Sequence, residues 1–158
     1  MKRILGLVPH AIAIFAAVIF LDSLRFKFTN APETQEIFGR LDSWAASFGA
    51  DGLFAQTGLF SQYVIGTAEL FASALFLIGI IPAFRRLQAL AALIAVCVMS
   101  GAISFHLFTP LGTDPNNDGG GLFIAACVVW ATSWLMLFLR RKELFALIAG
   151  LGKALFGR

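Results

Sequence analysis

Four long runs of mostly apolar residues constrain the fold of this chain more than any other feature. They span residues 4–24, 63–84, 87–108 and 121–139. A helix needs about 20 consecutive apolar residues to cross the hydrocarbon core of a bilayer. Glu69 is the only charged residue in the second run, and the third and fourth runs have none. The sequence therefore predicts an all-α integral membrane four-helix bundle.

The composition supports a membrane environment and a single domain over residues 1–158. Hydrophobic residues make up 59% of the chain and charged residues 13%, and the mean hydropathy is +0.84. A soluble protein carries about 25% charged residues, and a chain of this length could not bury so much apolar surface from water. The net charge of +3 comes from short basic clusters beside apolar runs. Such clusters orient membrane proteins, and we expect no nucleic-acid partner.

The connections between the runs predict further elements. Only Arg85 and Arg86 separate the second and third runs, which predicts a tight antiparallel hairpin. Residues 33–41 have the pattern of an outer amphipathic helix, with Asn30 as its candidate cap. Residues 109–120 are rich in Pro, Asn, Asp and Gly and predict a loop. The tail, residues 142–158, has apolar residues at helical spacing and predicts a C-terminal interfacial helix.

The charge distribution predicts the orientation in the membrane. Most Lys and Arg residues fall on one side: Lys2, Arg3, Arg85, Arg86, Arg140, Arg141, Lys142, Lys153 and Arg158. The connections on the other side carry most of the acidic residues. Because cytoplasmic loops of membrane proteins are enriched in Lys and Arg, the basic side is expected to be cytoplasmic. Both termini would then lie in the cytoplasm, with the protein in the inner or plasma membrane as a multi-pass protein.

Glu69 is the sharpest candidate for a functional residue. It lies about 9 Å inside the outer boundary of the second run at helical rise. A carboxylate at this depth must be neutral, paired or exposed to water. Gly66, Ala72 and Ser73 share its helical face, which permits close contact with another helix. A hydrogen bond that joins two helices and a ligand or proton site both fit this pattern.

Four further residues complete the candidate ligand site near the outer surface. His106 lies at the end of the third run and titrates near neutral pH when unperturbed. We expect it to approach Glu69, although an interfacial histidine bonded to a backbone carbonyl is the plainer alternative. Arg25 and Lys27 follow the first run and diverge on a helix, and either could supply a cation or extend towards the headgroups. Asp118 could complete the pocket or cap the fourth helix.

No metal site or catalytic motif is predicted. Residues 114–119 copy the first half of a calcium-binding loop, but the required glutamate position holds Ala125. His10 follows Pro9, which favours a kink with a locally satisfied imidazole. The chain contains no nucleophile elbow and no phosphate-binding loop. We therefore expect the protein not to be an enzyme on its own.

Several motifs resemble the DoxX and DoxX-like family of small four-helix membrane proteins. They are residues 24–29 after the first run, 63–70 opening the second, 101–106 closing the third, and 117–120 before the fourth. The resemblance covers roughly residues 20–140. It implies a four-helix membrane bundle associated with redox systems, because some members are subunits of quinone-linked complexes and others accompany oxidative-stress proteins. Within these motifs it favours Lys27 over Arg25.

The sequence is compatible with three functions. The first is a non-catalytic subunit of a membrane redox or oxidative-stress system, in contact with an oxidoreductase and with a quinone or other small apolar ligand. The second is an assembly or scaffold protein in the lipid bilayer. The third is a small-solute or proton-coupled carrier, which needs polar residues through the whole thickness. A homo-oligomer is compatible with each of them.

Overall fold

The computed structural model describes residues 2–157, and those residues contain helices but no strands. The α-helices are α1 (Lys2–Phe28), α2 (Pro32–Ala46), α3 (Gln62–Ile78), α4 (Arg86–Phe108), α5 (Gly121–Leu139) and α6 (Arg141–Phe156). A short 3-10 helix, Pro82–Phe84, lies between α3 and α4. The prediction of an all-helical chain is confirmed over the described residues.

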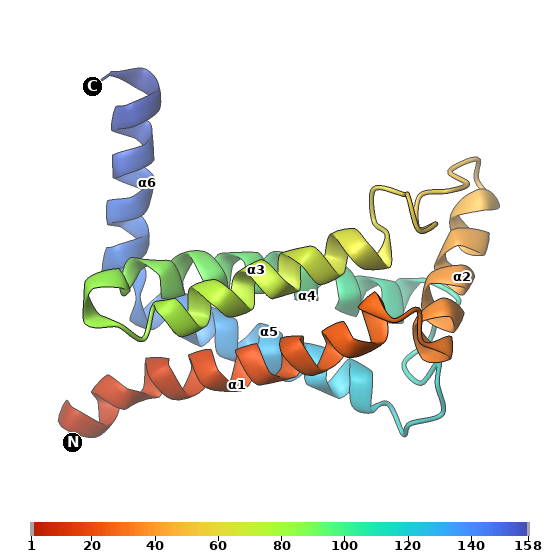
Figure 1. The fold of residues 1–158 in the computed structure, drawn as a ribbon, viewed down its shortest axis with the longest axis horizontal. Helices are drawn as coiled ribbons and strands as arrows, with labels where there is room; N and C mark the ends of the chain where they lie inside the picture. Colours follow the sequence, from red (N-terminus) through yellow and green to blue (C-terminus); the bar gives the residue numbers. More distant parts are fainter. Residues whose placement is uncertain (1, 158) are drawn as a thin grey trace.

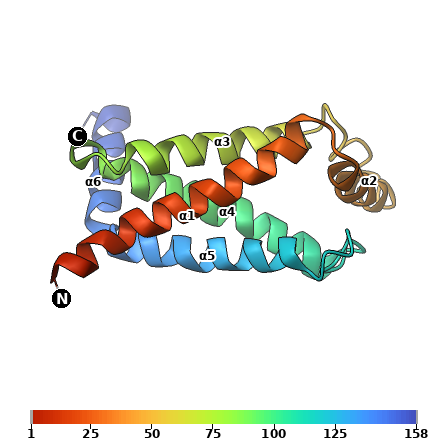
Figure 2. The same ribbon diagram turned by 60° about the horizontal axis from the view of Figure 1, so that its bottom comes forward.

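Four of these helices lie side by side (Figures 1 and 2). Helix α1 packs on α3, α3 on α4, α4 on α5, and α5 returns to contact α1. Helix α2 covers one end of this group, which we call the α2 end (Figure 1). The turn between α3 and α4 lies at the opposite end, which we call the α6 end because α6 leaves the group there. Helix α6 runs crosswise to the four long helices (Figure 1).

Small side chains bring the long helices close together. The buried core contains eight alanines, contributed by α1, α3, α4 and α5: Ala13, Ala16, Ala17, Ala72, Ala91, Ala92, Ala95 and Ala126. Larger residues, including Phe20, Phe76 and Met136, fill the space between them. Small residues at helix contacts are the usual means by which membrane helices approach one another, since lipid provides little hydrophobic drive for association.

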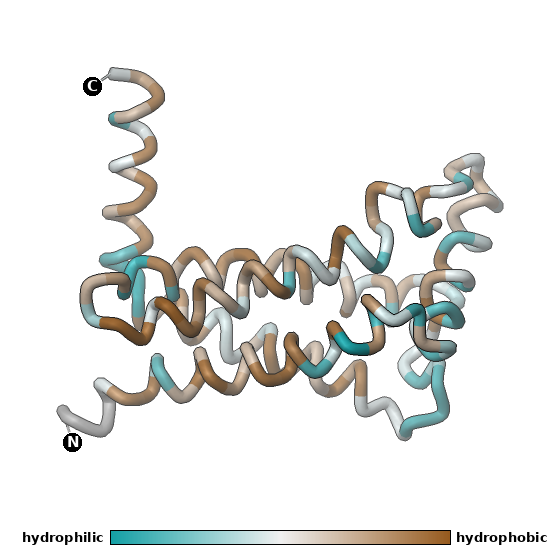
Figure 3. The backbone as a smooth tube through the Cα atoms, in the orientation of Figure 1, coloured by the Kyte–Doolittle hydropathy of each residue, from teal (hydrophilic) through white to brown (hydrophobic). Residues whose placement is uncertain are grey.

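Three helices are long and apolar enough to cross a membrane: Gly6–Phe28 of α1, Arg86–Phe108 of α4 and Gly121–Leu139 of α5. Their outward faces, like that of α3, expose large apolar side chains such as Val18, Phe71 and Trp134. Figure 3 shows apolar positions along these helices and polar ones gathered towards the ends. Continuous apolar surface of this extent is rare on soluble monomers. The fold is that of a membrane protein.

The helix in the second apolar run is shorter than predicted. Helix α3 ends at Ile78 rather than at residue 84, and residues 79–85 form the connection to α4. Gly79 closes the helix, and a Cβ there would lie 2.6 Å from Cγ of Gln88. Pro82 then opens the 3-10 turn, since it has no amide hydrogen to continue an α-helix. The hairpin between the second and third runs is therefore longer than Arg85 and Arg86 alone.

The other boundaries agree more closely with prediction. Helices α4 and α5 match the predicted runs within one residue, whereas α1 continues one turn beyond Leu24 to Phe28. The amphipathic segment forms α2, but Asn30 does not cap it. Asn30 instead adopts a positive φ of 55° in the turn between α1 and α2. The predicted tail forms α6, which begins at Arg141.

Candidate functional site

Glu69 lies on the buried face of α3. The residues three and four positions away, Gly66, Ala72 and Ser73, are also buried, as the helical spacing predicted. Gly66 lets α1 approach, because a Cβ at this position would lie 3.3 Å from the Phe28 ring. The Ser73 hydroxyl donates to the Glu69 carbonyl at 2.8 Å. Glu69 is thus fixed in the contact between α1 and α3 and does not face lipid.

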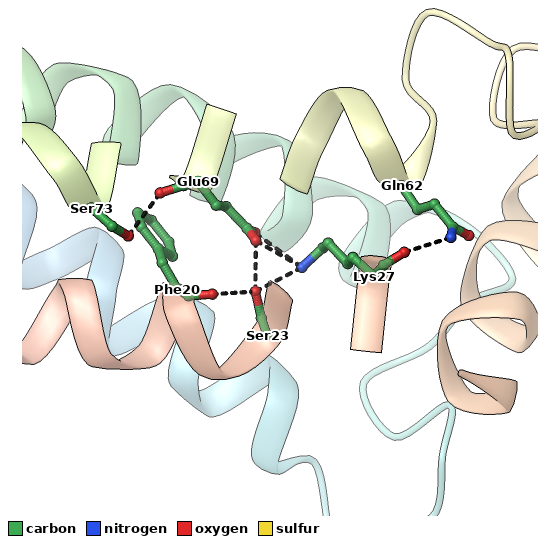
Figure 4. Close-up of polar contacts among 6 residues, drawn as sticks. All are labelled: Phe20, Ser23, Lys27, Gln62, Glu69 and Ser73. Carbon is green, nitrogen blue, oxygen red and sulfur yellow. Dashed lines mark hydrogen bonds and ion pairs between the residues drawn. The ribbon is translucent and has the colours of Figure 1, made fainter. Parts of the chain in front are cut away.

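The last turns of α1 supply the partners of Glu69. Ser23 and Lys27 are four residues apart, so they lie one above the other on the same helical face. Lys27 Nζ lies 2.9 Å from Oε2 of Glu69 and 3.1 Å from Oε1. The same ammonium group donates to Oγ of Ser23 at 3.0 Å. The Ser23 hydroxyl in turn lies 2.6 Å from Oε2 of Glu69 (Figure 4).

This cluster is internally satisfied. The three ammonium protons of Lys27 have three acceptors, and both carboxylate oxygens of Glu69 accept at least one hydrogen bond. The side chains of Lys27 and Glu69 are only 14% and 4% exposed. Two opposite charges removed from water need close pairing and further hydrogen bonds to offset their desolvation. The cluster of Ser23, Lys27 and Glu69 provides both without an external group.

A second set of polar contacts lies beside the cluster, on the side of the α2 end. The amide of Gln62 donates to the Lys27 carbonyl at 2.7 Å and to Oδ1 of Asn30 at 2.6 Å. Its Oε1 accepts from Gln35 of α2 at 2.7 Å. The Tyr63 hydroxyl donates to the same Asn30 oxygen at 2.8 Å. Gln62 thus satisfies a carbonyl left open where α1 ends, and it ties α1, α2 and α3 together.

Of the two predicted cations, the structure brings only Lys27 to Glu69. Arg25 points outward and pairs with Asp22 on the same helix, with Nε and Oδ1 3.1 Å apart. Both side chains of this pair are more than half exposed. The guanidinium of Arg25 also lies over the Phe26 ring. The predicted divergence of Arg25 and Lys27 on a helix is confirmed.

His106 does not join this cluster, contrary to prediction. It is buried, and Nδ1 lies 2.6 Å from the carbonyl oxygen of Gly112. Since a carbonyl only accepts, Nδ1 carries the proton. The ring packs edge-to-face on Phe123 of α5. The plainer alternative, a histidine bonded to a backbone carbonyl, is what the structure has, because the loop after α4 folds back within reach of the imidazole.

Asp118 caps α5 and takes no part in a pocket with Glu69. Its carboxylate accepts from the amides of Gly120, Gly121 and Leu122 at 2.9–3.1 Å. Partial desolvation acts to raise the pKa of Asp118, but these amides and the contact with Asp114 hold it below its ordinary value. A negative charge at this position also complements the positive end of the helix dipole.

The sequence did not identify a second buried polar cluster, which lies at the α6 end. Gln88 of α4 is fully buried, and its Oε1 accepts from Nε and Nη2 of Arg140 at 3.0 and 2.8 Å. Its Nε2 lies 3.3 Å from Nδ1 of His10. Arg140 also contacts Glu143 at 3.4 Å. The partner of His10 therefore comes from another helix and is not local. The only feature of the sequence that indicated this cluster was Gln88, an uncharged polar residue near the start of the third apolar run.

Two cavities in the described part of the chain lie against α2. An open groove of about 740 Å³ is lined mainly by α2, including Gln35, Arg40 and Trp44, together with Pro110. A smaller cavity of about 130 Å³ lies between α2 and residues 54–56. Glu69, Lys27 and His106 line neither of them. The polar cluster on α1 and α3 is therefore separate from both of these cavities.

This packing determines what the cluster of Ser23, Lys27 and Glu69 can do chemically. The ion pair can hold α1 against α3, and its charges are already balanced by each other. Residues 2–157 bring together no group of three or more His, Cys, Asp or Glu side chains that could hold a metal ion. In comparisons with known proteins, no family model, no curated protein and no solved structure matches this chain.

Proposed function

We propose that this chain crosses the membrane four times, with α1, α3, α4 and α5 as the spans and both termini in the cytoplasm. Helix α3 has 17 residues, which is at the short end of what a crossing requires. The apolar residues 79–84 that follow it extend the hydrophobic length. The neighbouring helices α1, α4 and α5 can all cross, and α3 lies between α1 and α4. Four crossings also account for the basic residues gathered at the α6 end.

The role supported best is that of a non-catalytic subunit of a membrane redox or oxidative-stress system. One observation carries the non-catalytic part: every hydrogen-bond partner of the Glu69 carboxylate comes from Ser23 and Lys27. A buried carboxylate held in this way stabilises a helix contact. The redox assignment rests on the resemblance of residues 20–140 to the DoxX family.

A carrier fits the packing poorly. The clusters around Glu69 and Gln88 lie towards opposite ends of the long helices, and the buried apolar core lies between them. Phe20, Phe76 and Met136 fill that layer and are almost completely buried. A carrier needs polar groups or water through the whole thickness. The scaffold function remains the alternative to a redox subunit, because both require only a stable bundle.

Affinity purification from native membranes in a mild detergent tests this role. The variant Lys27→Met/Glu69→Leu removes both charges together, so it should fold without leaving a buried charge unpaired. We expect it to retain the same partner protein as the wild type, in the same amount, with a membrane oxidoreductase among the copurifying proteins. The ion pair would then be structural and the chain a subunit of that enzyme.

The same purification distinguishes the alternatives. Quinone extracted with the wild type and lost in the double variant would mean that the charges take part in ligand binding, and would contradict a purely structural ion pair. A partner without redox chemistry would favour the scaffold function. The matched control is Arg25→Gln, which changes an exposed cation two residues from Lys27 and should copurify as the wild type does.

A further inference from the structure

The junction between α5 and α6 is a hydrogen-bonded corner. Arg140 separates the two helices and is only 8% exposed. Its guanidinium donates twice to Gln88 of α4 and contacts Glu143 in the first turn of α6. Leu144 packs against the main core. These contacts on both sides of the junction fix the direction in which α6 leaves the bundle.

Exposed cations lie on both sides of this corner. Arg85 and Arg86 precede Gln88 by three and two residues, whereas Arg141 and Lys142 directly follow Arg140. The hydrogen bonds between Gln88 and Arg140 therefore bring the two basic pairs close together at this corner. All four are exposed, with Arg141 lying over the Phe138 ring. Glu143 is the only acidic residue in 79–88 and 139–157, and Arg140 already contacts it.

Helix α6 exposes an apolar face beyond the corner. Phe145, Ile148, Leu151, Leu155 and Phe156 are all more than half exposed. At 100° per residue, these five fall within one half of the helix surface. Lys142 and Lys153 lie at similar angles near the border of that half, about three turns apart along the helix. Long basic side chains at such positions reach headgroups while the apolar residues insert. The crosswise direction of α6 (Figure 1) places this helix along a bilayer surface if the four long helices cross it.

We propose that this corner is a binding surface for anionic phospholipids. The phosphate-bearing headgroups pair with Arg85, Arg86, Arg141 and Lys142, and the acyl chains lie against the apolar face of α6. Charge complementarity selects the occupant, because a zwitterionic lipid offers no net charge to a surface with four exposed cations and no free carboxylate. The proposal rests on the four crossings proposed above, and it adds a lipid class that those crossings do not require.

Native mass spectrometry of the full chain in detergent tests the proposal. Phosphatidylglycerol and phosphatidylcholine with identical acyl chains are titrated separately, and bound lipid is counted at each concentration. We expect phosphatidylglycerol to bind more than about 25-fold more tightly, because one pair of cations alone would give a preference of that size. Each cation near a membrane surface contributes about a fivefold gain in affinity for anionic lipid. The variants Arg85→Gln/Arg86→Gln and Arg141→Gln/Lys142→Gln should each lose about 25-fold in affinity for phosphatidylglycerol and little for phosphatidylcholine.

The matched control is Arg25→Gln/Arg40→Gln, which removes two exposed cations towards the α2 end. It should bind phosphatidylglycerol as the wild type does. Equal binding of the two lipids, or an equal loss in the control and in the corner variants, would overturn the proposal while leaving the membrane crossings intact. Binding of neither lipid would overturn the proposal as well. The two double variants change different segments, the start of α4 and the start of α6. A folding defect in one variant therefore still leaves the other as a test.

Discussion

Replacing Lys27 by methionine should lower the free energy of unfolding by about 3–5 kcal/mol, the usual cost of breaking a buried ion pair from one side. The substitution leaves the carboxylate of Glu69 buried with Ser23 as its remaining donor. Glu69 is 4% exposed, so water cannot replace the lost ammonium without opening the contact between α1 and α3. Unfolding in mixed detergent micelles, followed by circular dichroism, measures the change.

Two further variants make this prediction specific to the pair. Lys27→Met/Glu69→Leu should recover most of the lost stability, because a buried ion pair replaced by apolar residues of similar size is often close to neutral. Arg25→Met removes an exposed cation from the same helix and should change stability by less than about 1 kcal/mol. A double variant as unstable as Lys27→Met alone would show that the two charges do not act as a pair.

Replacing Gln88 by leucine should cost about 3 kcal/mol, because hydrogen bonds to charged groups are strong and a buried donor left without a partner is costly. Oε1 of Gln88 accepts two hydrogen bonds from Arg140. Leucine removes both of these bonds and also the contact with His10. The loss is expected to loosen α6 as well as the bundle, since Arg140 joins α5 to α6.

Thermal unfolding in detergent measures the first effect, and amide hydrogen exchange of residues 141–156 measures the second. The matched control is Gln56→Leu, an exposed glutamine whose only side-chain hydrogen bond among the described residues is long, at 3.4 Å. It should leave both measurements unchanged. If Gln88→Leu behaved like Gln56→Leu, the cluster at the α6 end would not stabilise the corner.

Hydropathy and helical spacing predicted much of the fold. Helices α4 and α5 begin and end where charge or turn-forming residues interrupt an apolar run. Hydropathy could not detect the end of α3, because residues 79–84 are as apolar as the helix before them. The end there depends on Gly79 packing against Gln88 and on Pro82. Backbone geometry determines where α3 ends, and this boundary cannot be inferred from hydropathy.

The candidate site was also predictable only in part. The cost of burying Glu69 required a partner, and helical spacing separated Lys27 from Arg25. Which helix would supply the partner depended on the packing order, and α1 rather than α4 faces Glu69. His106 found a carbonyl in the loop after α4, a contact that depends on loop conformation. Gln88 and Arg140 are 52 residues apart, and nothing in their local sequence pairs them.

The side of the membrane reached by each connection is the most direct test of the four crossings. Single cysteines at Ser47, Ala83, Thr113 and Ala154, all exposed positions, are introduced into a Cys97→Ser/Cys127→Ser background. A membrane-impermeant maleimide should label the cysteines at Ser47 and Thr113 in intact cells. Those at Ala83 and Ala154 should react only after permeabilisation. Labelling of the Ala83 position from outside, together with Ser47, would show that α3 does not cross and would contradict the four-span topology.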